Sequence, residues 1–373
     1  MTHGKQASEK STTNYSENEG KAMAEIAVGK GNWANASARS KARKAKLLDE
    51  TRLRQLMKSG PDTIAASIGE LDYRRELDIY SARLSGADLV EAALSHNLDR
   101  ELTEVMGFCQ GRLKRIVSVF ALRFSYSNAK AVLRAVNGGI TVENLSNSVL
   151  PDENELNVSW LDIARQSENL QEAAAAMRGT PWGSAISDLD ADTRLQEYED
   201  ALDRHYYHEA ISALRTSGQS HSLLLGYLRT EIDHRNIVNL LRALRQNLSA
   251  EQRAGLILEG GRALKGNLLR SASQADTEDA LMEVLRRSNM ETAELEGALK
   301  ESHEHGGFDP VVSYLASERR ADLRRMSHLN PLSAFPLIYY LESKVLEVQN
   351  LRLLVRGKAV GLSDDVIEAH MAF

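Results

Sequence analysis

The sequence predicts an all-α protein made of three tandem homologous helical domains. Its 373 residues include only 6 prolines and 5% aromatic residues, while Ala, Leu, Glu and Arg, which favour helices, are abundant. One amphipathic stretch also occurs three times in a fixed register, which indicates triplication of a unit of about a hundred residues. Such a unit is longer than ankyrin or TPR repeats, which run about 33 to 34 residues, so we expect each copy to be a small domain.

The repeated stretch is clearest at residues 231–245, and its other copies lie at 124–134 and 347–356. Each copy contains an asparagine, and successive asparagines are 108 and 114 residues apart. An arginine follows six residues later, and apolar residues at the fourth and fifth positions complete a helical stripe. The aligned asparagines are Asn128, Asn236 and Asn350, and the arginines are Arg134, Arg242 and Arg356.

Each copy also predicts where one helix ends and the next begins. The twelfth residue after the asparagine is apolar, the thirteenth is Ser or Thr, and the fifteenth is acidic. A Ser or Thr after an apolar residue is typical of an N-cap, and an acid in the first turn complements the positive helix end. The expected N-caps are Thr141, Ser249 and Ser363.

We expect the helical domains to span residues 33–139, 140–247 and 248–373, after a disordered or partly helical tail at residues 1–32. A large side chain 54 to 60 residues before each asparagine forms a weaker second marker, at Tyr73, Trp182 and Met290. The apolar stripe is as strong in the outer copies as in the middle one. We therefore predict a closed arrangement, with the three asparagines in a roughly equilateral triangle, rather than an open ladder with polar caps.

Composition excludes several classes of function. A net charge of −6 gives no general attraction to nucleic acid. Cys109 is the only cysteine, which excludes an intramolecular disulfide and a thiolate metal cluster. Signal-peptide and membrane-spanning patterns are missing, so we expect a soluble or peripheral protein. A basic stretch at residues 39–58 suits acidic lipid or RNA, but a solvated helix face is the preferred interpretation.

Candidate chemical motifs are weak. The glycines lack the spacing of a phosphate-binding loop, so we expect no nucleotide site. Residues 188–199 resemble a calcium loop, but Thr193 replaces the glycine of its sharp turn, and helix capping is preferred. The pairs His205/His208 and His303/His305 lack a third metal ligand at usable spacing. We therefore predict no catalytic residue, no cofactor and no metal.

The residues of the repeated stretch are expected to be structural. We predict that the asparagines hydrogen-bond a neighbouring loop rather than bind a ligand. Asp233 and Glu347, three residues before their asparagines, are interpreted as local helix partners rather than as a catalytic acid pair, and Ser125 takes this place in the first copy.

The chain resembles the C subunit of the archaeal A-type ATP synthase, which is related to the d subunit of the vacuolar ATPase. The similarity covers the whole chain after the tail and is strongest at residues 227–242, 347–358 and 52–77. The tail is longer than this family leads us to expect, and Trp33 stands where a tyrosine is expected.

The resemblance implies a funnel of three helical domains about a pseudo-threefold axis. It implies a non-catalytic rotor subunit that joins the D and F subunits of the central stalk to the membrane proteolipid ring, so that ion flow drives ATP synthesis. It further implies a peripheral position at the cytoplasmic face of the cell membrane, without nucleic acid. The alternatives are a helical-repeat adaptor or scaffold and, with less support, an all-α enzyme, for which no Asp-Asp-x-x-Asp cluster is found.

Overall fold

The structure is a computed structural model that describes residues 31–190, 192–215, 219–288 and 290–372. These residues form helices and no strand, which confirms the predicted all-α class. The predicted tail lies almost wholly outside the described residues. The described helices are α2 (Trp33–Lys44), α3 (Glu50–Met57), α4 (Pro61–Gly69), α5 (Arg74–Tyr80), α6 (Gly86–Phe108), α7 (Gly111–Asn137), α8 (Val142–Ser148), α9 (Glu155–Gln166), α10 (Leu170–Ala176), the 3-10 turn η1 (Gly183–Ala185), α11 (Leu195–Leu214), α12 (Gln219–Arg245), α13 (Ala250–Leu256), α14 (Asn267–Gln274), α15 (Glu278–Arg287), α16 (Ala293–His305), α17 (Asp309–Leu329), α18 (Phe335–Ala359) and α19 (Asp364–His370).

The chain divides into two compact units. The first contains the described residues up to Asp203 and those from Pro331 onward, and the second is Arg204–Asn330. Helix α11 begins in the first unit and ends in the second. The compact units thus do not coincide with the predicted repeats, and the repeat boundaries remain a prediction about equivalent sequence.

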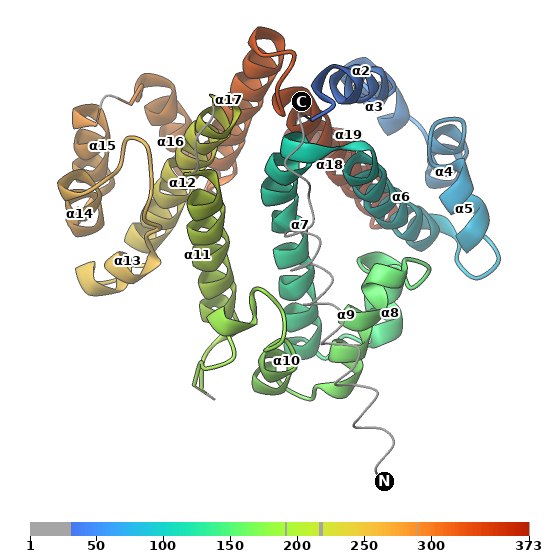
Figure 1. Ribbon diagram of the computed structural model, residues 1–373, viewed down its shortest axis with the longest axis horizontal. Helices are drawn as coiled ribbons and strands as arrows, with labels where there is room; N and C mark the ends of the chain where they lie inside the picture. Colours follow the sequence, from blue (N-terminus) through green and yellow to red (C-terminus); the bar gives the residue numbers. More distant parts are fainter. Residues whose placement is uncertain (1–30, 191, 216–218, 289, 373) are drawn as a thin grey trace. The chain divides into compact units, whose positions relative to one another are not determined.

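In the first unit, the C-terminal helix α18 packs against helices from the start of the chain. It contacts α2 and α6 extensively, and α4 and α7 as well (Figure 1). Val348, Leu351 and Leu354 of α18 share one buried apolar core with Leu53 of α3 and Ile64 of α4. The predicted first and third repeats therefore contact each other, whereas in an open ladder each repeat touches only its neighbours in sequence.

The second unit has its own core, which forms between α12 and the helices α14 to α17 (Figure 1). Leu240 and Leu241 of α12, the apolar pair of the repeated stretch, are fully buried there. They share the core with Leu285 of α15 and with Val311 and Leu315 of α17. Removal of this apolar surface from water stabilises the unit.

The helices that carry the repeated stretch, α7, α12 and α18, are called the signature helices below. Each one packs against short helices of the next predicted repeat. Helix α7 contacts α9 and α10, α12 shares its core with α14 and α15, and α18 shares its core with α3 and α4. The signature helix of the third predicted repeat thus packs against short helices of the first predicted repeat.

Each signature helix ends where the sequence predicts, and a seven-residue helix follows it: α8, α13 or α19. The N–H of the twelfth residue donates to the carbonyl of the seventh, as Leu248 does to Ala243 at 3.0 Å, which is the Schellman pattern. The residue before it has a positive φ, and glycine or asparagine tolerates that conformation best. These residues are Gly139 (φ 62°), Asn247 (φ 54°) and Gly361 (φ 78°).

The three predicted N-caps are found, but only two use their side chains. Thr141 accepts a hydrogen bond from the Asn144 N–H at 3.2 Å. Ser249 and Gln252 form a reciprocal capping box. Ser363 occupies the N-cap of α19 with extended backbone, yet its side chain makes no cap hydrogen bond.

Candidate functional site

Two polar contacts join the signature helix α18 to α6. The guanidinium of Arg356 donates to both carboxylate oxygens of Glu91, and Arg352 donates to the Ser95 hydroxyl at 2.6 Å. Glu91 is buried, so its carboxylate depends on this partner for compensation of its charge. The contact joins residues 265 positions apart and fixes the end of the chain against its beginning.

Matching contacts join α7 to α11. The guanidinium of Arg134 donates to both oxygens of Glu199, at 2.6 and 2.7 Å. The Lys130 ammonium lies 2.7 Å from a carboxylate oxygen of Asp203. These are the same positions of the repeated stretch as those of Arg356 and Arg352 on α18.

The partners of these cations are also equivalent in sequence. Glu199 follows Glu91 by 108 residues, the same spacing that separates Asn128 from Asn236. Sequence reasoning singled out the arginines but not Glu91, and it considered Glu199 only as the last residue of a calcium-like loop. The signal was present as an acid 37 residues before the first and second asparagines.

The second unit lacks this pair of contacts. Arg242 is exposed, and its guanidinium has no hydrogen-bonding partner within the described part of the chain. The position that corresponds to Glu91 and Glu199 is Ser313, and Val238 stands where the other signature helices carry a cation. Here α12 and α17 share an apolar core, and His234 of α12 lies 3.4 Å from a carboxylate oxygen of Glu318 on α17.

Two of the three asparagines bind a loop backbone in the same way. The amide of Asn236 donates to the Leu258 carbonyl at 2.8 Å and accepts from the Leu258 N–H at 2.7 Å. Asn350 exchanges the same two hydrogen bonds with Ala372, at 2.7 and 3.1 Å, again 22 residues later. These are loop contacts of the kind expected from the sequence. Asn128 is half-buried and makes no such pair of bonds among the described residues.

The interpretation of Asp233 as a local helix partner is wrong. Its buried carboxylate accepts hydrogen bonds from the N–H groups of Arg262, Ala263 and Leu264, at 2.8 to 3.1 Å. Gly261 lies so close that a Cβ there would stand 2.1 Å from the carboxylate. Burial raises the pKa of Asp233, and the three backbone donors act against that rise. A helix-local partner cannot provide such donors, because the N–H groups inside a helix are already bonded.

Glu347 has one local partner and two distant ones. Lys344, three residues earlier on α18, donates to it at 3.0 Å, as a local helix partner does. The N–H of Leu48 and the hydroxyl of Tyr73 also donate to its carboxylate. Lys344 further donates to the Tyr73 hydroxyl at 2.7 Å, and both charged side chains are almost fully buried. Burial, together with the neighbouring Glu347, raises the pKa of Tyr73 well above its ordinary value, so the phenol stays a donor.

A second buried carboxylate extends this network on α6. Glu101 accepts from the Tyr340 hydroxyl of α18 and from the Arg43 guanidinium of α2. Arg100 lies 3.4 Å from it and also donates to Glu76 at 2.7 Å. Buried charges that are this well paired hold helices in one register, because loss of any partner leaves an uncompensated charge.

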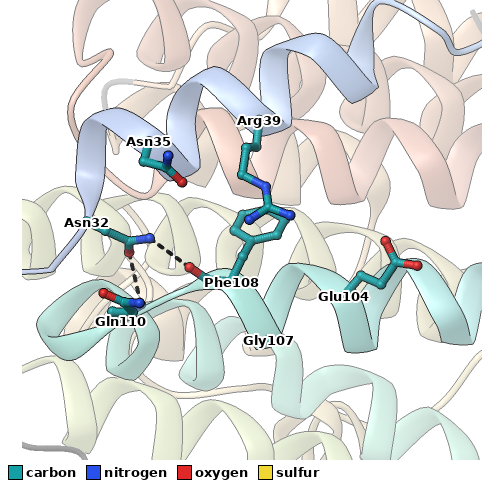
Figure 2. Close-up of a pocket in the computed structure, with 7 residues that line it drawn as sticks. All are labelled: Asn32, Asn35, Arg39, Glu104, Gly107, Phe108 and Gln110. Carbon is teal, nitrogen blue, oxygen red and sulfur yellow. Dashed lines mark hydrogen bonds between the residues drawn. The ribbon is translucent and has the colours of Figure 1, made fainter.

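An open pocket of about 520 Å³ lies where α2 passes the corner between α6 and α7. Figure 2 shows Arg39 reaching from α2 over the ring of Phe108, with its guanidinium carbon 4.3 Å from the ring centroid. Asn32 forms one wall, since its amide donates to the Phe108 carbonyl at 2.7 Å and accepts from the Gln110 N–H at 3.0 Å. The side chain of Asn35 also lines the pocket.

The basic stretch at residues 39–58 is not one uniform solvated face. Arg43 is paired with two glutamates of α6, and Arg54 with Glu50 and Glu368. Lys44 lies over the Tyr339 ring, 5.2 Å from its centroid. The preferred interpretation therefore holds for only part of the stretch, because several of its cations bind other helices.

The weak motifs have ordinary surroundings. His303 contacts Glu278 at 2.7 Å, and exposed His208 contacts Glu209 at 3.2 Å. Glu199, the last residue of the calcium-like loop, is bound to Arg134. No cluster of three His, Cys, Asp or Glu side chains suited to a metal occurs among the described residues. Within the same residues, no helix is both long and apolar enough to cross a membrane.

Comparison with known proteins gives a consistent result. A family model described as "ATP synthase (C/AC39) subunit" matches residues 36–370. The C subunit of the A-type ATP synthase of Haloquadratum walsbyi is 30% identical over 344 residues, which are 89% of this chain and 96% of that protein. The proteins of the same name from Methanococcoides burtonii and Haloferax volcanii are each 27% identical over 90% of this chain, and over 93% and 95% of their own lengths.

Proposed function

The chain belongs to the C/AC39 subunit family of ATP synthases, and on this premise we propose that it couples the central stalk of an A-type ATP synthase to the membrane rotor ring. Members of this family are structural rather than catalytic subunits. In this role the chain binds the D and F subunits of the stalk and the proteolipid ring, and it transmits torque so that ion flow drives ATP synthesis. It acts as a peripheral protein at the cytoplasmic face of the cell membrane.

The match of the family model over residues 36–370 carries this proposal. The build of the first unit supports it, because a part that transmits torque must resist shear between its helices. Lys344 and Glu347 are buried as a pair, and Glu101 binds groups from α2 and α18. Sliding of α18 along α6 would expose these charges to an apolar interior without partners, which is costly.

We also propose that the three repeats close into a ring about a pseudo-threefold axis, which gives the funnel expected for this family. The packing of the third repeat on the first supports closure, as does the recurrence of the Arg134–Glu199 contact as Arg356–Glu91. A head-to-tail contact that recurs and returns to the first copy is the rule for closed rings.

The test is purification of the tagged full-length chain from detergent-solubilised membranes, followed by reconstitution in vesicles. Stalk and ring subunits should copurify, and ATP hydrolysis should drive ion uptake. Arg356→Gln, which breaks the contact between α18 and α6, should lower ion uptake per ATP hydrolysed, whereas Arg242→Gln, which removes an arginine without a partner, should not. Recovery of the chain without stalk or ring subunits would refute the proposal.

A further inference from the structure

The pocket between α2 and the α6–α7 corner is polar, and three of its side chains, those of Asn35, Arg39 and Gln110, make no hydrogen bond or ion pair with the described residues. Arg39 is exposed and lies over the Phe108 ring, and it forms no ion pair with a carboxylate among the described residues. The side chains of Asn35 and Gln110 line the same pocket and have no hydrogen-bonding partner among those residues. An arginine held flat on an aromatic ring loses little further entropy on binding, which is why such groups are common at protein interfaces.

Hydrogen bonds between residues of the chain itself hold the walls of the pocket in place. The Asn32 amide bridges the Phe108 carbonyl and the Gln110 N–H, so it fixes the corner relative to α2. Cys109 between them is buried, and burial raises the pKa of its thiol to about 12, which leaves it an unreactive packing group. The pocket is therefore preformed, and a partner does not have to order it.

A group of cations follows directly after the pocket residue Gln110 in the chain. Helix α7 begins with Arg112, Lys114 and Arg115 and has no acidic residue in its first turn. Burial raises the pKa of the Cys109 thiol, and the charges of Lys114 and Arg39 act against that rise, so both of these cations lie near this corner. None of the three α7 cations has an acidic partner among the described residues.

The acid that lines the pocket does not neutralise these cations. Glu104 is paired with Arg43 and with Arg100, the latter at 3.0 Å. Burial raises its pKa, but the hydrogen bonds from these two arginines bring the pKa below its ordinary value. Glu104 thus belongs to the internal network. A net positive surface remains on a chain whose total charge is −6.

We propose that this surface, made of Asn35, Arg39, Gln110, Arg112, Lys114 and Arg115, binds an acidic polypeptide segment of a neighbouring subunit. The proposal rests on the proposed function, since it assumes that the chain is part of a complex. Carboxylates of the segment pair with the cations of α2 and α7, and the two amides bind its backbone. The chain's large exposed hydrophobic residues lie elsewhere in the described sequence, so the apolar side chains that help a protein insert into a lipid surface are missing here.

The test uses the ATP synthase complex stripped of this subunit and titrated with the purified full-length chain at several salt concentrations. Arg39→Gln, Lys114→Gln and Arg115→Gln are combined in one variant. The matched control combines Arg52→Gln, Lys58→Gln and Arg270→Gln. It also removes three positive charges, but from exposed residues outside this surface. Circular dichroism melts verify that both variants fold, and Arg39→Lys with the α7 cations intact serves as a milder second variant.

The triple variant should bind the stripped complex at least about tenfold more weakly than the control and with a smaller salt dependence, because rim charges act mainly through screened attraction. Equal affinity of the triple variant and the control would overturn the proposal. A second outcome would also overturn it: the wild type binds vesicles of anionic phospholipid, the triple variant does not, and the two proteins bind the complex with the same affinity. Failure of the wild type to rebind would instead refute the proposed function, so the two failures are distinguishable.

Discussion

Asn236 and Asn350 show how one side chain can secure a loop. A carboxamide carries a donor and an acceptor side by side, and it therefore matches the N–H and C=O of a single backbone residue. Leu258 is buried, so both of its backbone groups depend on Asn236 for their hydrogen bonds. A residue that binds a ligand would keep its amide free, which these two asparagines do not.

Asn236→Ala should destabilise the protein by about 2–4 kcal/mol, because two buried backbone groups each lose a partner at about 1–3 kcal/mol. The control is Asn128→Ala, since Asn128 is half-buried without such bonds and should cost less than about 1 kcal/mol. Urea unfolding followed by circular dichroism measures both. Equal losses would show that the asparagines do not act through the loop.

His234 should make stability depend on pH. Burial and the nearby Arg319 lower the pKa of this histidine to about 4, whereas an unfolded histidine titrates near 6.5. Between these two pH values His234 binds a proton in the unfolded chain but not in the folded chain. The contribution of His234 to the free energy of unfolding is therefore fully present above about pH 6.5. It is lost as the pH falls toward 4, and the loss is at most about 3 kcal/mol.

The measurement is the unfolding free energy of wild type and His234→Gln between pH 4 and 7. Glu231 and Asp322 are nearby and raise the pKa of His234, and Glu318 lies 3.4 Å from its ring. The difference between the two proteins is thus more informative than either curve. It should shrink as the pH falls, and a difference that stays constant would exclude titration of His234 as the cause.

At the scale of the element, the backbone structure at the C-terminal ends of the signature helices is the same in all three copies, whereas the side-chain contacts of these helices with other helices differ. Three consecutive features recur in all three copies: a left-handed residue, a returning backbone hydrogen bond and an N-cap. They require only residues within about six positions of one another, so a short sequence suffices to specify them.

Gly361→Ala should destabilise the end of α18 by about 1 kcal/mol, because its φ of 78° is unfavourable for a residue with a Cβ. No neighbouring atom lies within 4 Å of the added Cβ, so backbone strain is the sole cause. Gly361→Asn should cost less, since Asn247 holds the corresponding place. Gly297→Ala, within α16, should have the opposite sign. Thermal melts compare the three variants, and equal effects of Ala and Asn at position 361 would contradict this account.

Glu91→Gln should destabilise the contact between α18 and α6 by about 1–3 kcal/mol, because the buried Glu91 side chain loses its charge-assisted hydrogen bonds with Arg356, whose own side chain is largely exposed. Glu283→Gln is the control, since its ion pair with Arg286 is half exposed on both sides and should be worth less than about 1 kcal/mol. Chemical unfolding of both variants decides the matter. A loss no greater than that of the control would mean that packing alone holds these helices.

At the scale of the whole molecule, closure of the ring is the open prediction. We expect the Cα atoms of Asn128, Asn236 and Asn350 to form a roughly equilateral triangle, with the signature helices related by rotations of about 120°. An experimental structure of the chain within its complex provides the three distances. If the longest side approaches the sum of the other two, the repeats form an open ladder.

The sequence by itself determined the helical class, the ends of the signature helices and the loop contacts of Asn236 and Asn350. These features depend on hydrophobic periodicity and on capping residues close along the chain, and their triple recurrence distinguishes them from chance. Each of these contacts joins residues no more than 22 positions apart, so a short stretch of chain carries the signal.

Only the tertiary structure decided which groups meet across the fold. Asp233 binds N–H groups some 30 residues away, and Arg356 binds Glu91 at a separation of 265 residues. Such pairs exist because α18 packs on α6, and that packing depends on many apolar side chains acting together. A helix period reveals which face is buried but not which helix covers it. The packing therefore had to be seen before the partners of the repeated arginines were known.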